Sequence, residues 1–313
     1  MPSPIAIDAG HGFTKALAVN GASSIFPSLI CPAPAGIELG RFGQQDSVSV
    51  ETDHLPKTRY LVGDAARLRA TSLFSQDKAA DLATLALTWI AASRLTGPGY
   101  HAITLGAGVP LAWYASQQGS LAQALTQTVR LENGHGTTLA VVDTTIYPQG
   151  IGALAAQDDL PARALVGLVD IGYRTIDFLL AETDDAGTPR PILDRSGTYS
   201  GGMHQAYLGL AQTIEKDTGT HWEPHELVDR DSITAHGHAI SIVAPRNQAI
   251  TDLSHAVQTH LSTQWDGLID RLDALYLAGG GAMALQVANP WPGAQMIDNP
   301  QWANVRGFLG LLA

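Results

Sequence analysis

The sequence lacks the usual features of secreted, membrane-spanning and nucleic-acid-binding proteins. Cys31 is the only cysteine in 313 residues, which excludes an internal disulfide and predicts a reducing, cytoplasmic environment. Four of the 18 basic residues are lysines, the arginines are scattered, and the formal net charge is −11, so we expect no direct nucleic-acid contact. No apolar run reaches the roughly 18 residues of a membrane-spanning helix, and no leader-like segment opens the chain.

Two common nucleotide-binding motifs are also missing. The dipeptide Gly-Lys never occurs, so the sequence contains no Walker A loop. Gly106 and Gly108 form a Gly-x-Gly, but Val109 and Pro110 follow where a dinucleotide-binding loop would open a helix. A nucleotide would therefore have to be bound by a different arrangement.

The remaining composition predicts a well-folded α/β protein. Hydrophobic residues make up 45% of the chain, charged residues make up 15%, and the 32 glycines and 17 prolines are dispersed. Hydrophobic periodicity and turn residues predict strands at 24–30, 47–51, 60–63, 101–110, 137–143, 144–147 and 274–282, and helices at 81–93, 121–129, 203–216, 250–272 and 299–311. Histidines cluster within 217–249, but Pro224 and the absence of cysteine there favour surface residues over a zinc site.

One pattern occurs twice, at residues 5–17 and 168–180. Each copy is an apolar strand, then Asp-x-Gly, a short turn, a threonine and a second apolar strand, which predicts a β-hairpin with an acidic bend. Two such hairpins half a chain apart suggest a duplicated fold. The alternative is a pair of ordinary hairpins, because Asp and Gly are common turn residues.

We interpret the two hairpins as clamps on one phosphate chain. Backbone N–H groups near glycine can approach phosphate oxygens, and threonine hydroxyls can donate to them. A carboxylate needs a Mg²⁺ ion with its waters between itself and a phosphate, and Lys15 would add positive charge. The residues assigned to these clamps are Asp8, Gly10, Gly12, Thr14 and Lys15 in the first copy and Asp170, Gly172 and Thr175 in the second.

Three further segments fit a nucleotide site. Gln149 follows a strand and precedes a helix, where an amide could orient an attacking water, although an ordinary helix-start residue is the alternative. Gly201 and Gly202 precede a helix whose free N–H groups suit a phosphate or ribose, and Glu215 near its end could reach an adenine or sugar edge. The strand 274–278 ends in three glycines, Gly279, Gly280 and Gly281, against which a flat ring could lie.

This set of motifs, in this order, resembles the actin-like ATPase superfamily over essentially the whole chain, and is most similar to ParM-type bacterial and archaeal actins. Local matches at 60–64, 108–111 and 303–307 support the resemblance. The resemblance implies that Asp8 and Asp170 hold Mg²⁺ through water, that Gln149 and Asp170 serve catalysis, and that ATP or ADP is the nucleotide. His11 and Arg174 depart from the small or polar residues that are most common in the two loops.

The implied architecture is an actin-like α/β fold, with two duplicated ribonuclease H-like domains around a nucleotide cleft. Domain I would be 1–165, with a small outer subdomain at about 21–90 and the tail 297–313 packing back onto it; domain II would be 166–296. We expect an ATPase that polymerises head to tail, and that reaches plasmid DNA through a DNA-binding adaptor of the ParR type rather than directly.

The same scaffold allows a different function class. A small-molecule kinase would need a carboxylate base, and Asp143 and Asp177 are the nearby candidates. A DnaK-type chaperone is disfavoured, because the chain is too short to add a substrate-binding domain. Light scattering after addition of MgATP distinguishes a filament from a kinase.

Overall fold

The computed structural model describes residues 1–34, 47–70, 75–157, 159–288 and 291–312. The chain folds into two compact units. Unit 1 consists of Met1–Ala156 and Asn304–Ala313, and unit 2 of Gln157–Ala303. Parts of the expected outer subdomain, at 35–46 and 71–74, lie outside the described residues. Among the described helices, none is long and apolar enough to cross a bilayer.

Unit 1 is built on a nine-stranded sheet with the order β3-β2-β1-β7-β9-β8-β5-β6-β4. The strands are β1 (Ser3–Ala9), β2 (Phe13–Ala18), β3 (Ser23–Pro27), β4 (Ile30–Pro32), β5 (Ser47–Thr52), β6 (Thr58–Val62), β7 (Gly99–Val109), β8 (Thr128–Glu132) and β9 (Gly136–Pro148). β1, β7 and β9 are parallel neighbours, so their carboxyl ends meet at one edge of the sheet.

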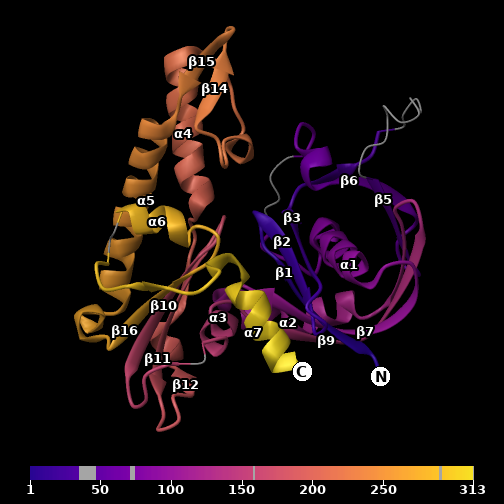
Figure 1. Ribbon diagram of the computed structural model, residues 1–313, viewed down its shortest axis with the longest axis horizontal. Coiled ribbons are helices and arrows are strands. Elements are labelled where there is room, and N and C mark those ends of the chain that lie inside the picture. Colours follow the sequence, from indigo (N-terminus) through magenta and orange to yellow (C-terminus); the bar gives the residue numbers. More distant parts are fainter. Residues whose placement is uncertain (35–46, 71–74, 158, 289–290, 313) are drawn as a thin grey trace. The chain divides into compact units, whose positions relative to one another are not determined.

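Helix α1 (Leu82–Thr96) lies within the curve of this sheet (Figure 1). Asp81 caps its first turn by accepting from the N–H groups of Ala83 and Thr84. Trp89 is fully buried in the core that α1 forms with the strands. The other helices of unit 1 are α2 (Leu111–Leu125), the short α3 (Ile151–Ala155) and α7 (Ala303–Leu312).

Unit 2 repeats the arrangement on a smaller scale. Its sheet runs β12-β11-β10-β16-β17, with β13 also pairing with β11. The strands are β10 (Leu165–Ile171), β11 (Ile176–Thr183), β12 (Pro189–Pro191), β13 (Gly197–Tyr199), β16 (Ala274–Ala278) and β17 (Gln295–Met296). The long helices α4 (Met203–Thr218) and α5 (Val243–Gln264) lie side by side, with the hairpin of β14 (Ser232–Ala235) and β15 (His238–Ser241) at one end (Figure 1).

The two sheets share one connectivity. The order β3-β2-β1-β7-β9 in unit 1 matches β12-β11-β10-β16-β17 in unit 2. In both, the central strand pairs antiparallel with the strand that follows it and parallel with a later strand, which is reached through α1 in unit 1 and through α4 and α5 in unit 2. The prediction of a duplicated α/β fold is confirmed.

Several predicted element boundaries were wrong. The helix expected at 121–129 is α2, which begins at Leu111 and ends at Leu125, and strand β8 follows at Thr128. The alternating side chains of β8 are buried at Val129 and Leu131, which is strand periodicity. The two strands expected at 137–147 are one continuous strand, β9. Helix α5 begins seven residues earlier and ends eight residues earlier than the helix expected at 250–272. Gly267, in the left-handed region, ends that segment.

Candidate functional site

In unit 1, the predicted first phosphate loop lies at the end of β1. Asp8 is 3% exposed and stands opposite Lys15 in the β1–β2 ladder. The ammonium of Lys15 lies 2.5 Å from Asp8 Oδ2, so the two residues form a buried ion pair. A Cβ added to Gly10 would lie 3.1 Å from Phe13 O and 3.7 Å from Lys15 Nζ, so the glycine lets the turn pass close over this pair.

Gln149 reaches the same carboxylate from a different strand. It follows β9 directly, and its N–H donates to Val109 O over 2.8 Å. Its side-chain Nε2 donates to Asp8 Oδ1 over 2.8 Å. The structure therefore brings Asp8, Lys15 and Gln149 together at the edge where β1, β7 and β9 end.

Opposing effects set the charge state of Asp8. Burial alone would raise its pKa, but the nearby charge and hydrogen bond of Lys15, the charge of Lys78 and the hydrogen bond from Gln149 together hold the pKa below its ordinary value. Asp8 is thus ionised at neutral pH, and its negative charge is held in a largely dry site.

Thr14 forms a hydrogen bond within the first loop. Its hydroxyl is fully buried and lies 2.8 Å from Ser28 Oγ, which in turn donates to Gly10 O over 2.5 Å. Because Ser28 uses its only proton on that carbonyl, Thr14 must donate to Ser28. The Thr14 proton therefore braces the loop through Ser28. Ser28 directly follows β3 and belongs to none of the sequence motifs.

Lys78 is a second residue of this edge that none of the sequence motifs contains. Its side chain is 2% exposed, and its ammonium donates to Ala9 O over 3.0 Å and to Gly108 O over 3.3 Å. Lysine is seldom buried. No sequence pattern marks this one, because its acceptors are backbone carbonyls at the ends of two distant strands.

The C-terminal helix α7 holds the Gln149 loop in place. Asn304 accepts a hydrogen bond from the Gly150 N–H over 3.0 Å. The buried ring of Phe308 stacks on Tyr147 with a centroid separation of 5.5 Å. A Cβ at Gly108 or at Gly152 would lie 2.5 Å from the Phe308 ring, so both positions require glycine. The segment from Asn304 onward thus packs within unit 1, and residues 297–303 belong to unit 2.

In unit 2, the second hairpin closes at the end of β10. Asp170 is 5% exposed and pairs across the ladder with Asp177. Gly172 donates to Thr175 O over 3.0 Å, which closes the turn, and Tyr173 and Arg174 form its tip. A Cβ at Gly172 would lie 2.6 Å from Thr175 O, so the turn needs this glycine. Each of the two hairpins therefore has an acidic residue, a glycine and a buried threonine at corresponding positions.

The start of α4 packs onto this turn. The N–H of Met203 donates to Gly172 O over 3.1 Å, and the N–H of His204 donates to Tyr173 O over 2.7 Å. A Cβ at Gly202 would lie 2.5 Å from Gly172 O, which explains that glycine by packing. The expectation that these helix N–H groups are free for a ligand was therefore wrong for Met203 and His204. They anchor the hairpin instead.

Two titratable side chains, Arg174 and His204, lie at the tip of this turn. Arg174 is half-buried, and burial lowers its pKa. Burial, followed by the charge of Arg174, lowers the pKa of His204 to about 4, so the imidazole is neutral at pH 7. In the first loop, the other departure from the family pattern, His11, packs edge-on against Trp113 with a centroid separation of 6.2 Å.

The three glycines after β16 differ in their surroundings. A Cβ at Gly279, which has a φ of +86°, would overlap Asp170 Oδ1 and Ile171 O. A Cβ at Gly281 would overlap Ile171 and Met203. Gly280 has nothing closer than Gln301, at 3.6 Å. Asp170, Gly202, Gly279 and Gly281 thus form one tight cluster, and Gly280 alone is open.

Glu215 lies away from this cluster. It is exposed on α4, twelve residues after Met203, which corresponds to about 18 Å along a helix. Its nearest recorded partner is His221, whose Nδ1 lies 3.6 Å from Glu215 Oε2.

A cavity of about 240 Å³ lies between α4, α5 and α6 (Ala282–Ala288). Its lining residues are Tyr207, Asp229, Arg246, Asn247, Ile250, Thr251, Ala284 and Ala288. Both α4 and α6 begin at the Asp170 cluster. Tyr207 lies just beyond the first turn of α4, and Ala284 lies in the first turn of α6. The cavity is therefore about one helical turn from the hairpin, and Glu215 does not line it.

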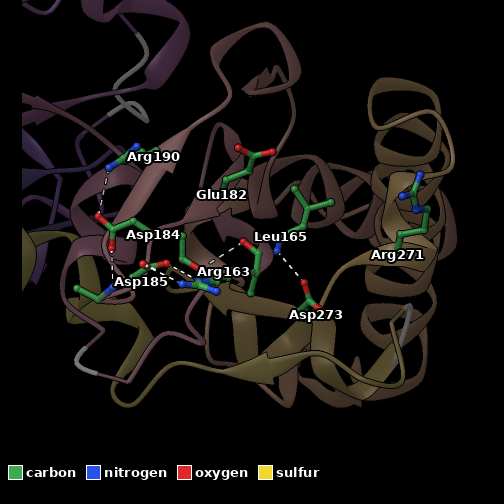
Figure 2. Close-up of a pocket in the computed structure, with 11 residues that line it drawn as sticks. Arg163, Leu165, Glu182, Asp184, Asp185, Arg190, Arg271 and Asp273 are labelled. Atoms are coloured by element: carbon green, nitrogen blue, oxygen red, sulfur yellow. Dashed lines mark hydrogen bonds and ion pairs between the residues drawn. The ribbon is translucent and has the colours of Figure 1, made fainter.

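A larger cavity, of about 880 Å³, has a different character (Figure 2). It lies where β10 begins and β11 ends, so it is at the opposite end of these strands from Asp170. Its charged groups largely satisfy one another: Arg163 pairs with Asp185, Arg190 with Asp184, and Asp273 accepts from the Leu165 N–H. None of the predicted site residues lines this cavity.

The available donors fit a metal that is bound mostly by water and phosphate. Within the described residues, no group of three or more His, Cys, Asp or Glu side chains could enclose a metal ion. Both oxygens of Asp8 already accept hydrogen bonds, from Gln149 and Lys15. Asp8 therefore suits an outer role beside Mg²⁺, which keeps several waters and uses few carboxylates.

Comparison with known families identifies the fold. A model described as the N-terminal domain of actin-like proteins matches residues 6–152, and a model described as the C-terminal part of archaeal MreB-like actin homologues matches 168–288. The chain belongs to the actin-like proteins. The matched segments contain both acidic hairpins and Gln149 of this actin-like protein.

Individual relatives agree with this assignment. Archaeal actin homologues of Thermoplasma volcanium and Thermoplasma acidophilum are each 24% identical, over 97% of this chain and 97% of their own. A 15-stranded ParM filament from Clostridium botulinum superimposes with a TM-score of 0.84 at 21% identity, covering 99% and 98% of the two chains. An archaeal actin homologue in complex with ADP superimposes with a TM-score of 0.80 at 20% identity, with the same coverage. The actin-like fold expected from the sequence is confirmed.

Proposed function

We propose that this actin-like protein is an ATPase whose nucleotide state controls its assembly into filaments. The observation that carries the proposal is the hydrogen bond from Gln149 to Asp8. It fixes an amide capable of orienting water beside the acidic residue of the first phosphate loop. The ADP complex of an archaeal actin homologue supports nucleotide binding, and the ParM filament supports self-association.

In this proposal the two hairpins bind the same nucleotide. Backbone N–H groups of Gly10 and Gly12 and the ammonium of Lys15 bind phosphate oxygens from one side, and the turn from Gly172 to Thr175 binds them from the other. Asp8 and Asp170 accept hydrogen bonds from waters on Mg²⁺, which would neutralise phosphate charge. Gln149 holds the attacking water, since it cannot itself remove a proton.

The cavity between α4, α5 and α6 suits the nucleoside part. Its walls are apolar at Ile250, Ala284 and Ala288, and it contains hydrogen-bonding groups at Tyr207 and Asp229. A small set of polar groups on apolar walls is typical of small-molecule sites. Its distance of about one helical turn from the Asp170 cluster matches the reach of a nucleotide. We propose that the base of the nucleotide occupies this cavity. Glu215 would make at most an outer contact with the nucleotide.

For the assembly we propose a head-to-tail contact between copies, because a heterologous contact that does not close gives an open filament. A nucleotide-dependent change of about 1.4 kcal/mol in that contact would shift the critical concentration tenfold. With a net charge of −11, the chain would reach DNA through a ParR-type adaptor, as in plasmid segregation in the cytoplasm.

A small-molecule kinase has less support. Of its two candidate bases, Asp177 is buried and accepts a hydrogen bond from Thr198 Oγ1 over 2.5 Å. Asp143 is exposed in the middle of β9, five residues before its end at Pro148. Neither carboxylate has the position of Gln149, which lies at the end of a strand and contacts Asp8.

The test is right-angle light scattering over a series of protein concentrations, before and after MgATP is added. We expect scattering to rise above a critical concentration and to decay as the nucleotide is consumed, with no rise when EDTA is present. Flat scattering at all concentrations, with hydrolysis that a sugar or small acid stimulates, would contradict the filament and favour the kinase.

A further inference from the structure

Lys78 is a buried cation that the proposed function leaves without a role. It lies in the segment before α1, and its ammonium donates to the carbonyls of Ala9 and Gly108. A lysine that is 2% exposed has lost most of its hydration, which is unfavourable unless the charge is compensated. Burial of a charge at this particular edge of the sheet therefore needs an explanation.

The two carbonyls show what Lys78 holds together. Ala9 is the last residue of β1 and is followed by the first phosphate loop. Gly108 is the penultimate residue of β7, and the next residue, Val109, accepts from the N–H of Gln149. Lys78 thus ties the end of β1, which carries the loop, to the end of β7, which accepts the hydrogen bond from Gln149. It also offsets two carbonyl dipoles, whose negative ends would disfavour a nearby anion.

The charge of Lys78 also acts on the site itself. It contributes to the lowered pKa of Asp8, so its field reaches that carboxylate. Lys15 acts on the same carboxylate directly, through a 2.5 Å ion pair with Asp8. We call the first phosphate loop with Asp8 and Gln149 the first half-site. It has two buried lysines near one aspartate, where an ordinary hairpin turn needs neither.

We propose that Lys78 is a positioning cation for the phosphate groups of the bound nucleotide. It fixes the ends of β1 and β7 and supplies positive potential where the first phosphate loop begins. This inference rests on the proposed nucleotide function and adds a residue that the sequence motifs do not contain.

The number of phosphates provides a test that a purely structural role does not mimic. Lys78→Met keeps a long side chain without charge, and Lys78→Gln keeps an N–H donor for the carbonyls without charge. We would measure the affinities of adenosine, AMP, ADP and ATP by displacement of a fluorescent nucleotide. For both variants we expect a loss that grows with each phosphate, from none for adenosine to about tenfold or more for ATP.

The matched control is Lys57→Met, because Lys57 is an exposed lysine of unit 1 that pairs with Glu132. It should leave all four affinities unchanged. Equal losses for all four ligands, or no loss in either Lys78 variant, would overturn the role of Lys78. So would a circular dichroism spectrum showing that both variants are unfolded, since Lys78 would then be purely structural. A wild-type chain that binds none of the ligands would overturn the proposed function together with this inference.

Discussion

The side chain of Gln149 donates to Asp8 Oδ1 over 2.8 Å, across 141 residues of sequence. The other oxygen of Asp8 accepts from Lys15, so one buried carboxylate holds both the cation that we propose for phosphate binding and the amide that we propose for positioning water. If a phosphate attracts Lys15, the ion pair between Lys15 and Asp8 changes. The hydrogen bond from Gln149 to Asp8 would then change as well. In the proposed function, this arrangement would give a direct route by which nucleotide binding prepares hydrolysis.

Replacing Gln149 should separate hydrolysis from binding. Gln149→Ala removes the amide that orients water, and we expect about 100-fold slower ATP hydrolysis with nucleotide affinity changed by less than about threefold. Phosphate release and nucleotide titration measure the two effects. Gln118→Ala, on the exposed face of α2, is the matched control and should change neither. Equal losses of binding and turnover in Gln149→Ala would remove this residue from its role.

The ionised state of Asp8 predicts a pH dependence of stability. Its folded pKa lies below the ordinary value of 3.8, so its contribution is fully present above that pH and is lost as the pH falls through the folded pKa. Asp8→Asn leaves Lys15 buried without its charge partner and should lower the free energy of unfolding by about 3 kcal/mol at pH 7. The difference from wild type should shrink below about pH 4.

Urea unfolding at a series of pH values measures this difference. Asp53→Asn is the control, because Asp53 is exposed and pairs with Arg130 only at 3.4 Å. It should alter stability by less than about 1 kcal/mol at any pH. An Asp8→Asn variant as stable as wild type at pH 7 would show that the buried pair does not stabilise unit 1.

Adjacent glycines provide a test of the second half-site, which is the cluster around Asp170 in unit 2. Gly279→Ala combines a φ of +86° with overlap on Asp170, and should destabilise the protein by about 2–3 kcal/mol. Gly280→Ala has 3.6 Å of clearance, so stability should change by less than about 0.5 kcal/mol. Thermal unfolding distinguishes the two. If a ligand lies against this backbone, Gly280→Ala should weaken nucleotide affinity alone; unchanged affinity would exclude that contact.

The packing of α7 makes a prediction for unit 1. Gly152→Ala places a methyl group 2.5 Å from the Phe308 ring, and we expect a loss of about 1–3 kcal/mol with slower hydrolysis, because the neighbouring Gln149 loop shifts. Gly119→Ala, on α2 with nothing within 4 Å of the added carbon, should instead gain about 0.5–1 kcal/mol. Similar effects of the two substitutions on unfolding would contradict the packing account.

The acidic hairpins were predictable because local chemistry determines them. Asp8 and Asp170 each precede a glycine that the turn geometry requires, and apolar strands flank both turns, so the pattern is visible in the sequence. The position of Gln149 could be predicted for the same reason, because it follows a strand directly. The duplicated order of the two sheets followed from recognising this repeat.

Other features depend on contacts between distant segments. Lys78 binds the ends of two strands, and its neighbouring sequence shows no pattern that would predict this. The roles of Gly202 and Gly279 were attributed to ligand contact, whereas close packing on Gly172 and Asp170 already requires them. The start of α2 was missed because Gly119 and several polar residues obscure its helical periodicity.

The central claim is that both half-sites bind a single nucleotide, and calorimetric titration with MgATP tests it most directly. We predict one site per chain, with affinity that Lys15→Met in unit 1 and Thr175→Val in unit 2 each reduce by about tenfold or more. Two independent sites per chain, or affinity that is sensitive to only one of the two substitutions, would contradict the account.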